Sequence, residues 1–490
     1  MLAIVPRPVS LVERPGSLRI SPRDLALPGS VTGAVHVTTD APGLPPEGYR
    51  MSVSPAGIRI VAGSDAGVFR ARTTLRQLVP PEALAALSPG SGRQRSWQVP
   101  CLEIVDQPRF SWRGLMLDTC RHFFPVEFVK KFIDTLAFHQ MNVFHWHLTE
   151  DQGWRIEIRR HPELTAVGGW RSGTVIGRLP GDDPPRYDGI RHGGFYTQDQ
   201  VRDVVAYAAE RQVTVVPEIE MPGHALAALA AHPELSCTGG PFEVSRTWGI
   251  HEDVYCAGNE GVFALLEDVI DEVASLFPGP FLHVGGDECP KGRWKACPKC
   301  QARIQAEGLA DEDALQSWFI RRMERTVNAR GKRLVGWDEI LEGGLAPNAT
   351  VMSWRGDAGG VEAARQGHDV VMSPVTHCYL DYRQDEDPSD GQPAFDAYLP
   401  LEEVYPYDPV PAELTPEQAR HVLGVQGNLL TEYIAAPQRA EYMTWPRACA
   451  LAEAGWSPAG PREWGEFRAR LAAHLPRLDA LDVRYRPLDG

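Results

Sequence analysis

Residues 113–148 read RGLMLDTCRHFFPVEFVKKFIDTLAFHQMNVFHWHL, and this stretch decides the fold. The short apolar run 113–118 ends in an acid and is predicted to be a strand. Pro125 then opens a predicted helix, because proline suits the first helical turn and apolar residues follow at helical spacing: Val129, Phe132, Ile133, Leu136 and Ala137. A second strand is predicted over 142–148, so the chain alternates strand, loop and helix.

This alternation continues along the chain. Thr197 and Gln200 have the spacing of a capping box for the next helix. Further strands are predicted at 213–216, 281–284, 334–337, 350–354, 369–373 and 422–426. About eight strands over roughly 320 residues is the size of a (β/α)₈ TIM barrel, which we expect over residues 110–490. An open doubly wound sheet is the alternative, but it would normally carry a glycine-rich nucleotide loop after its first strand, and the sequence has none there.

Residues 1–109 have a different pattern and are predicted to form a small α/β domain. The segments 50–54 and 57–61 alternate polar and apolar residues around a turn, which indicates a hairpin of an antiparallel sheet. Residues 67–78 have helical spacing, and 80–98 is rich in Pro, Gly and Ser and predicts a loop. This domain shows no catalytic pattern, so we expect it to support the barrel.

Composition narrows the classes of partner. Of 490 residues, 43% are hydrophobic and 23% charged, as in ordinary globular proteins. The net charge of −15 argues against nucleic acid or an anionic membrane as a partner, because an acidic surface repels both. No apolar run approaches membrane-spanning length, and residues 1–16 show no signal-peptide pattern. We therefore expect a cytoplasmic protein, or a secreted one if a signal has been removed.

The nine cysteines are scattered and odd in number, which favours free thiols over a disulfide framework. Cys297 and Cys300 form a single C-x-x-C motif. A structural zinc site usually needs a second pair, and only Cys289 lies near in the sequence. Plain thiols or a loop clip are therefore favoured, and no metal or cofactor is expected.

Acids and tryptophans recur where the predicted barrel strands end, and functional residues of such barrels gather there. Residues 281–288, FLHVGGDE, place the adjacent carboxylates Asp287 and Glu288 after two glycines. Adjacent acids repel each other, which an active site can exploit by keeping one protonated and the other ionised. The alternative is a solvated acidic loop. Carboxylates and indoles without a basic patch suit a neutral, hydroxyl-rich ligand.

Four motifs extend this interpretation: residues 113–124 (RGLMLDTCRHFF), 145–155 (HWHLTEDQGWR), 216–224 (VPEIEMPGH) and 283–288 (HVGGDE). In this order, and on these elements, they resemble glycoside hydrolase family 20, the β-N-acetylhexosaminidases. The resemblance runs from about Leu11 to the C-terminus, and its first part is similar to the small α/β domain that precedes the barrel in that family. It implies an exo-acting, retaining hydrolase whose substrate's 2-acetamido oxygen is the nucleophile.

The resemblance also implies roles for individual residues. Glu288 would be the general acid and then the base for water. Asp287 would hold the acetamido N–H and offset the positive charge that develops there, and Tyr379 would bond the acetamido oxygen. Trp337 and Trp354 would enclose the acetamido methyl group. Without the resemblance, packing in the barrel core would explain the two tryptophans about as well.

The remaining predicted site residues bind hydroxyls or support the acid. Arg121 would bind the O3 and O4 hydroxyls, although an ion pair with Asp118 would also explain it. Asp381 and Glu432 would read O4 and O6. His224 and Glu150 would orient Glu288, and His224 alone would more simply cap a helix start. These are all implied by the resemblance, on the positions that match its motifs.

The chain departs from the family pattern at Leu430, where a tryptophan is expected two residues before Glu432. Leucine keeps apolar contact but lacks the flat face and the indole N–H. We expect a looser wall, weaker ground-state binding and an altered choice between gluco and galacto substrates, unless a neighbour such as Tyr433 substitutes. Glu150, where many members have Asp, is a milder change.

Two other classes of function stay open. His145 and His147 lie on one side of a predicted strand, and with His224, His283 and Asp287 they could form a catalytic zinc site. A histidine pair packed near the barrel mouth is the simpler explanation. A non-catalytic sugar-binding protein would keep the tryptophans and Arg121 but would not need Asp287 and Glu288. The family resemblance implies that the partner is a glycan with a terminal N-acetylhexosamine.

Overall fold

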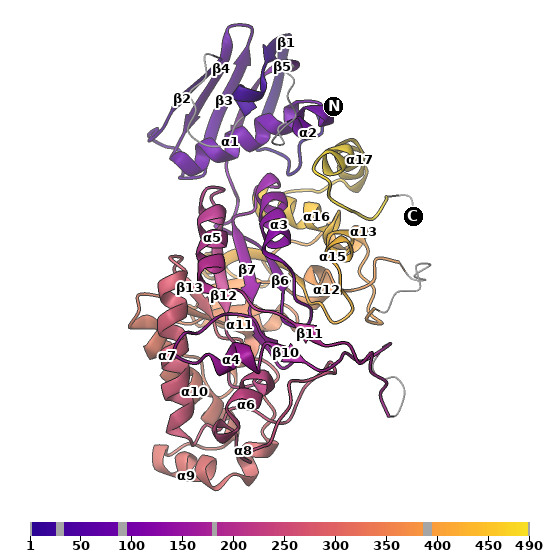
Figure 1. Ribbon diagram of the computed structural model, residues 1–490. Coiled ribbons are helices and arrows are strands. Elements are labelled where there is room, and N and C mark those ends of the chain that lie inside the picture. The colour runs from indigo at the N-terminus through magenta and orange to yellow at the C-terminus, as the bar shows by residue number, and fades with distance from the viewer. Residues whose placement is uncertain (1, 26–33, 87–95, 179–183, 386–393, 489–490) are drawn as a thin grey trace.

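The computed structural model describes residues 2–25, 34–86, 96–178, 184–385 and 394–488 (Figure 1). Two sheets dominate it, a five-stranded one at the N-terminus and a closed eight-stranded barrel. In the described part of the chain no helix is both long and apolar enough to cross a membrane.

The N-terminal sheet has the strand order β1-β5-β3-β4-β2. Its strands are β1 (Ser10–Ile20), β2 (Val35–Thr38), β3 (Tyr49–Ser54), β4 (Gly57–Ala62) and β5 (Trp97–Asp106), and beside it lie η1 (Pro22–Leu25), α1 (Asp65–Leu78) and α2 (Pro81–Ala85). The predicted hairpin is confirmed, since β3 pairs antiparallel with β4, and all pairs are antiparallel except β2 with β4. The predicted helix over 67–78 is α1, which begins after the N-cap Ser64. Part of the predicted loop is α2, and residues 87–95 of it lie outside the described residues.

Eight parallel strands close into the barrel in the order β12-β13-β14-β15-β16-β17-β6-β7, which confirms the predicted fold class. They are β6 (Trp112–Asp118), β7 (Val143–His147), β12 (Thr214–Glu218), β13 (Phe281–His283), β14 (Arg333–Trp337), β15 (Thr350–Ser353), β16 (Val370–Met372) and β17 (Val422–Leu429). Each predicted barrel strand matches one of these. The division after residue 109 stays a proposal, which falls between β5 and β6.

Helices follow most barrel strands and cover the outside of the barrel. The longer ones are α3 (Val126–Phe138), α5 (Gln198–Ala209), α7 (Glu260–Leu276), α9 (Pro298–Glu307), α10 (Glu312–Asn328), α11 (Ala358–Arg365), α15 (Pro437–Thr444), α16 (Arg447–Trp456) and α17 (Trp464–Ala480). Short elements fill the loops: β8 (Thr149–Glu150), β9 (Gly153–Trp154), α4 (Glu163–Ala166), β10 (Trp170–Arg171), β11 (His192–Gly193), α6 (Leu226–Ala231), η2 (Pro233–Leu235), α8 (Gly292–Ala296), η3 (Asp338–Leu341), α12 (Val375–Cys378), α13 (Leu401–Val404) and α14 (Pro416–Ala419). The capping box predicted for α5 is present, with Thr197 and Gln200 bonded reciprocally.

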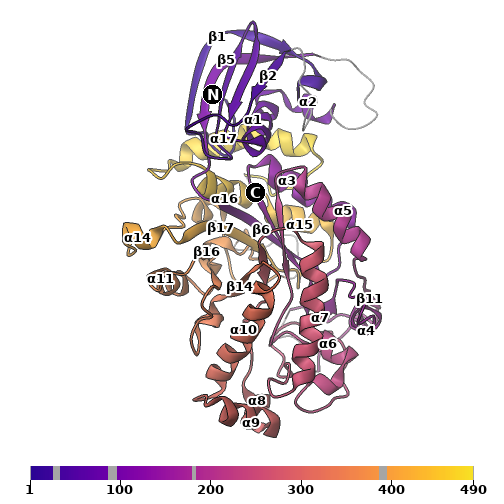
Figure 2. The same cartoon turned by 90° about the vertical axis from the view of Figure 1, so that its left-hand side faces the viewer.

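The N-terminal domain packs against the end of the barrel where the strands begin. Arg70 of α1 donates to the carbonyl oxygens of Met141 (3.1 Å) and Gln212 (3.0 Å), which lie just before β7 and β12. Figure 2 shows α17 crossing beneath the N-terminal sheet, while α8 and α9 lie at the opposite end of the molecule. The strand ends that carry the predicted site therefore face away from the support domain.

The barrel interior holds a buried apolar cluster and buried polar groups. The cluster consists of Trp112, Met116, Val143, Val216, Val335, Trp337, Met352 and Val371, of which Trp337 is the last residue of its strand. Of the buried polar groups, Glu218 and His283 end β12 and β13, and His145 lies within β7. The strand ends are where barrel enzymes carry their active sites.

Candidate active site

The loop after β13 brings two carboxylates into the mouth of the barrel. Gly285 and Gly286 adopt φ values of 64° and 94°, and a Cβ on Gly285 would lie 1.6 Å from Oε2 of Glu220. Only glycine lets the backbone pass there. Glu288 itself has φ 43°, a left-handed conformation that costs energy for a residue with a side chain and is concentrated at functional sites.

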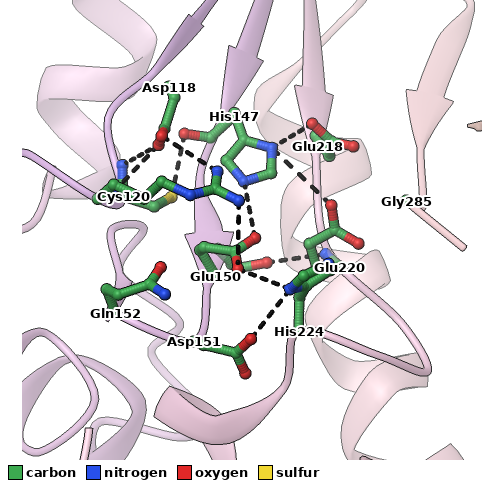
Figure 3. Close-up of polar contacts among 12 residues, drawn as sticks. Asp118, Cys120, His147, Glu150, Asp151, Gln152, Glu218, Glu220, His224 and Gly285 are labelled. Carbon is green, nitrogen blue, oxygen red and sulfur yellow. Dashed lines mark hydrogen bonds and ion pairs between the residues drawn. The ribbon is translucent and has the colours of Figure 1, made fainter. Parts of the chain in front are cut away.

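His224 contacts both carboxylates. Its Nε2 lies 3.5 Å from Oδ2 of Asp287 and 3.5 Å from Oε2 of Glu288. Its Nδ1 lies 2.7 Å from Oε1 of Glu150 and 2.9 Å from Oδ2 of Asp151 (Figure 3). Burial alone would lower the pKa of His224, but the charges of Glu150 and Asp287 raise it well above its ordinary value. His224 is therefore an imidazolium that joins two pairs of acids.

Arg121 is the second cation of the site. It lies 3.2 Å from Asp118, 3.7 Å from Glu150 and 3.1 Å from Glu432. The ion pair with Asp118, which the sequence offered as an alternative explanation of Arg121, is therefore present, and Arg121 also lines the cavity described below. Burial works to raise the pKa of Glu150, yet Arg121 and His224 hold it well below its usual range. Glu150 is a charged link between the two cations.

A deeper layer of charge surrounds Glu218 at the end of β12. Oε1 accepts from Nε1 of Trp337 (2.8 Å) and lies 2.8 Å from Nδ1 of His283. His145 Nε2 lies 3.1 Å from Oε2, and His147 bridges Glu218 to Glu150 (Figure 3). Burial lowers the pKa of His145 to about 4, whereas Glu218 and Glu150 overcome burial and raise that of His147 to about 10. His147 is the cation of this layer.

This layer does not favour the catalytic zinc hypothesis. His145 and His283 face the buried Glu218, and neither has exposed surface. A catalytic zinc needs a coordination position open to water or substrate. The contacts of His145 and His147 with Glu218 instead agree with the simpler explanation, a histidine pair packed near the barrel mouth.

Other acids of the site are held neutral. Burial, with the charges of Asp287 and Glu218, raises the pKa of Glu220 well above its ordinary value. Burial and Asp287 raise that of Glu339 to about 8, although Nε1 of Trp354 donates to it at 2.9 Å. Without a ligand, Glu220 and Glu339 are therefore uncharged carboxylic acids near Asp287, and neither repels it as a second negative charge would.

A cavity collects these groups at the strand ends, with an empty volume of about 930 Å³ including its open mouth. Ten of the eleven predicted site residues line it: Arg121, Glu150, Asp287, Glu288, Trp337, Trp354, Tyr379, Asp381, Leu430 and Glu432. His224 lies behind the wall, where it touches Asp287 and Glu288. Seven further residues line the cavity: His147, which the sequence suggested only as a zinc ligand, and Glu220, Trp248, Gly249, Ile250, Tyr382 and Phe395, to which it assigned no role.

Aromatic rings form one side of the cavity. Trp354 stacks on Tyr379 at a centroid distance of 6.0 Å and an interplanar angle of 26°. Tyr379 in turn lies 5.7 Å from Tyr382 and Tyr382 lies 6.2 Å from Phe395. Trp337 and Trp354 both point their indole N–H groups at buried acids, which fixes their planes. The rings can enclose a small apolar group such as a methyl.

Leu430 lies in this wall with Tyr382 and Phe395 as aromatic neighbours in the cavity lining. Tyr433, the substitute proposed from the sequence, is not among the residues that line the cavity; it packs edge-on against Phe395 at 5.1 Å. Phe395 belongs to a loop distant in sequence, which is why no local signal indicated it.

Asp381 and Glu432 carry buried oxygen atoms that have no hydrogen-bond partner among the residues that the structure describes: both of Asp381 and Oε2 of Glu432. Burial, with Glu432, raises the pKa of Asp381 well above its ordinary value. Burial, partly offset by Arg121, raises that of Glu432 to about 6. Orphan polar atoms at a cavity wall are costly unless a ligand satisfies them, and hydroxyl groups would do so.

Comparisons with known proteins agree with this geometry. The sequence model described as "Glycosyl hydrolase family 20, catalytic domain" matches residues 110–459, and "Glycosyl hydrolase family 20, domain 2" matches residues 11–107. The "Beta-hexosaminidase" of Porphyromonas gingivalis is 49% identical over 457 residues, which cover 92% of this chain and 56% of that relative. The "Beta-hexosaminidase" of Vibrio furnissii is 40% identical over 435 residues, covering 87% and 68%.

Solved structures are similar over nearly the whole chain. The exo-β-N-acetylglucosaminidase of Vibrio harveyi in complex with N-acetylglucosamine has a TM-score of 0.86 and 34% identity, covering 99% of this chain and 78% of that one. The β-N-acetylhexosaminidase of Bacteroides fragilis has a TM-score of 0.83 and 32% identity, covering 99% and 97%. The chain spans little more than half the length of the Porphyromonas relative and most of these two structures.

Proposed function

The chain belongs to glycosyl hydrolase family 20, and on this premise we propose that it is a retaining, exo-acting β-N-acetylhexosaminidase. It removes terminal β-linked N-acetylglucosamine or N-acetylgalactosamine from glycans, with the acetamide of the substrate as the nucleophile. One observation carries the proposal: Asp287 and Glu288 open into one cavity with Trp337, Trp354 and Tyr379. A single sugar ring in that cavity can present its leaving oxygen to one acid and its acetamide to the other.

In the first step Glu288 donates a proton to the glycosidic oxygen while the acetamido oxygen attacks C1. The C1–oxygen bond to the leaving group breaks, and a cyclic oxazolinium ion forms. Asp287 accepts the acetamido N–H, and its negative charge offsets the positive charge that develops on the ring. Tyr379 donates its O–H to the acetamido oxygen and aligns it for attack.

In the second step water attacks C1 from the side that the leaving group vacated. Glu288, now a carboxylate, takes a proton from this water, and the C1–oxygen bond of the oxazolinium ring breaks to restore the acetamide. Both displacements invert C1, so the configuration is retained. His224, fixed by Glu150 and Asp151, holds Asp287 and Glu288 in position through both steps.

Recognition of the sugar hydroxyls falls to Arg121, Asp381 and Glu432. Their side chains are buried, which supports binding of a chain terminus and hence exo action. Raised pKa values leave Asp381 able to donate as well as accept a hydrogen bond, which suits hydroxyl groups. The proposed partner is a glycan with a terminal N-acetylhexosamine, and the reaction needs no cofactor. Nine free cysteines support a reducing compartment such as the cytoplasm.

Hydrolysis of three aryl β-glycosides with one aglycone tests the proposal: the N-acetylglucosaminide, its galacto epimer and the plain glucoside. We expect cleavage of the two acetamido sugars only. Glu288→Gln should lower kcat by about 10²–10⁴-fold for a poor leaving group, and much less for an activated one that needs no proton. It should still bind N-acetylglucosamine in calorimetry.

Asp287→Asn is the matched variant, because it changes the neighbouring acid by the same single group. It should slow substrates with good and poor leaving groups alike, since it acts on the nucleophile. If the plain glucoside is cleaved as fast as the acetamido sugars, the acetamide is not the nucleophile. The roles of Asp287, Tyr379 and the two tryptophans would then be wrong.

A further inference from the structure

Four cysteines from three separate segments meet at one point outside the cavity: Cys237, Cys256, Cys297 and Cys300. We propose that they bind one zinc ion as a closed, tetrahedral structural site. Only Cys297 and Cys300 are neighbours in sequence, as the C-x-x-C motif. The second pair that this motif needs does not include Cys289; it consists of Cys237 and Cys256, which the fold brings to it.

The distances between the sulfur atoms fit this ion. Sγ of Cys256 lies 3.7 Å from that of Cys297 and 3.6 Å from that of Cys300, and Sγ of Cys237 lies 3.8 Å from that of Cys300. A Zn–S bond of about 2.3 Å gives tetrahedral sulfur–sulfur edges of about 3.8 Å. All four ligand atoms lie within 4.8 Å of one another, so one ion can reach each of them.

Other uses of four thiols fit less well. A disulfide needs sulfur atoms about 2.05 Å apart, whereas the three sulfur–sulfur distances given above are 3.6, 3.7 and 3.8 Å. An iron–sulfur cluster places inorganic sulfur between its cysteines and needs a wider cage. Four cysteine ligands leave no position for water or substrate, which is the pattern of structural rather than catalytic zinc.

The cluster lies mostly below the protein surface, with polar groups of the protein directed at it. Cys256, Cys297 and Cys300 are buried, and Cys237 is partly exposed. The backbone N–H of Gly258 hydrogen-bonds to the sulfur atoms of Cys256 and Cys300. A Cβ at Gly258 would lie 2.2 Å from the carbonyl carbon of Lys299, so glycine permits this approach. The guanidinium of Arg293 acts on Cys237 and partly offsets the negative charge of the site.

The site would fasten together the two loops that carry catalytic groups. Cys237 and Cys256 belong to the segment after β12, which also holds His224 and Trp248, and Cys297 and Cys300 follow the loop that holds Glu288. The contact between the loops continues where Nε1 of Trp294 donates to the carbonyl of Tyr255 at 2.9 Å, and N–H of Tyr255 donates to the carbonyl of Pro222 at 3.0 Å. The zinc touches no substrate, so its role is one of positioning.

Metal analysis of the purified full chain tests the assignment without reference to activity. The protein is expressed with zinc in the medium and purified without a chelator or a metal-binding tag. We expect about one zinc per chain by plasma mass spectrometry. Growth with cobalt instead should give the strong ligand-field and sulfur-to-cobalt bands of a tetrahedral thiolate site. These two measurements use the wild-type sequence and do not require a variant to fold.

Matched serine variants locate the metal. Cys256→Ser and Cys300→Ser should lose the zinc, while Cys101→Ser, a buried cysteine of the N-terminal sheet, should keep it. Chelation should lower the Tm of the wild type and of Cys101→Ser but leave that of Cys256→Ser unchanged. In the wild type it should lower kcat/KM through the loops, with full recovery on adding zinc.

Three results would overturn the proposal. A metal-free protein with all nine thiols open to reagent after denaturation would show that the cluster is plain thiols. A disulfide between any two of the four cysteines would assign it to redox chemistry. Bound iron would overturn the choice of metal. None of these depends on which glycoside the enzyme cleaves, so failure here leaves the proposed function untouched.

Discussion

The carboxylate of Glu47 joins the N-terminal domain to the barrel, and its replacement gives the most quantitative prediction. Oε1 of Glu47 lies 2.8 Å from Nη2 of Arg70 in α1 and 2.6 Å from Nη2 of Arg113 in β6. Both guanidinium groups are fully buried, and the side chain of Glu47 is 17% exposed. Burial alone would raise the pKa of Glu47, but the charges of Arg113 and Arg70 lower this pKa from 4.5 to about 2.

That pKa change sets the magnitude. Lowering the pKa of Glu47 from 4.5 to about 2 corresponds to about 3 kcal/mol of stability, because a tenfold change in an equilibrium constant is worth about 1.4 kcal/mol. Glu47→Gln removes this charge and leaves two buried cations facing each other, which should destabilise the protein by about 3–5 kcal/mol at pH 7. Because the folded pKa is depressed, the contribution is complete above pH 4.5 and is lost as the pH falls towards 2.

Urea unfolding at pH 7 and at pH 3 measures both the size and the sign. Glu103→Gln is the matched control, because Glu103 pairs with Arg14 at 3.0 Å in the same domain but on the exposed surface. It should cost at most about 1 kcal/mol. The reasoning is refuted if Glu47→Gln costs no more than Glu103→Gln, or if its cost does not shrink in acid.

Four further predictions concern the site. Glu220→Gln should keep activity near neutral pH within about threefold, because Glu220 is already a neutral acid there, and steady-state rates against Glu220→Asp and wild type measure this. His224→Gln should lower kcat/KM by about 10²-fold, through loss of the cation between Asp287 and Glu288, while far-UV circular dichroism stays unchanged. Phe395→Ala should raise KM by about tenfold with little change in kcat, because it removes an aromatic wall that is not aimed at the reacting atoms. Glu218 and Glu150 raise the pKa of His147 to about 10 despite burial, so the stability that protonated His147 contributes is complete below pH 6.5 and is lost as the pH rises to 10. The free energies of unfolding of His147→Gln and wild type, measured in urea, should therefore differ less at pH 10 than at pH 6.

The barrel was predictable because each of its elements has a local signature. β6, α3 and β7 follow from apolar runs of the right length and from the helical spacing that begins after Pro125. The acids that follow the predicted strands were then candidates for the active site, because parallel strands that close into a barrel bring their C-terminal ends to one face. For this reason Asp118, Glu218 and Asp287 lie at the same end of the barrel although they are far apart in the chain.

What the sequence did not reveal is set by closure of the fold. Cys256 lies 41 positions before Cys297. A search for a second pair near the motif finds Cys289 instead, and no local spacing points to Cys237. Phe395 lines the cavity from a loop with no regular spacing, whereas Tyr433, which the sequence suggested, is not among the lining residues. The cysteines and Phe395 meet residues from other loops only after the chain has folded, so no local pattern in the sequence reveals these contacts.

The distribution of charge in the cavity explains how so many acids can share it. Glu150 and Glu218 stay ionised because Arg121, His147 and His224 pair with them, whereas Glu220, Glu339 and Asp381 are held neutral by burial and by their charged neighbours. The ionised acids are thus paired within the protein, and of the neutral ones Glu220 and Asp381 line the cavity. Asp287 also lies in the cavity, and its Oδ1 is buried without a hydrogen-bond partner among the described residues. Its other oxygen, Oδ2, lies 3.5 Å from Nε2 of His224. A ligand that develops positive charge can therefore be stabilised by the Asp287 side chain. The same arrangement gives a neutral ground-state sugar little to gain from Asp287, so this residue should contribute more to rate than to affinity.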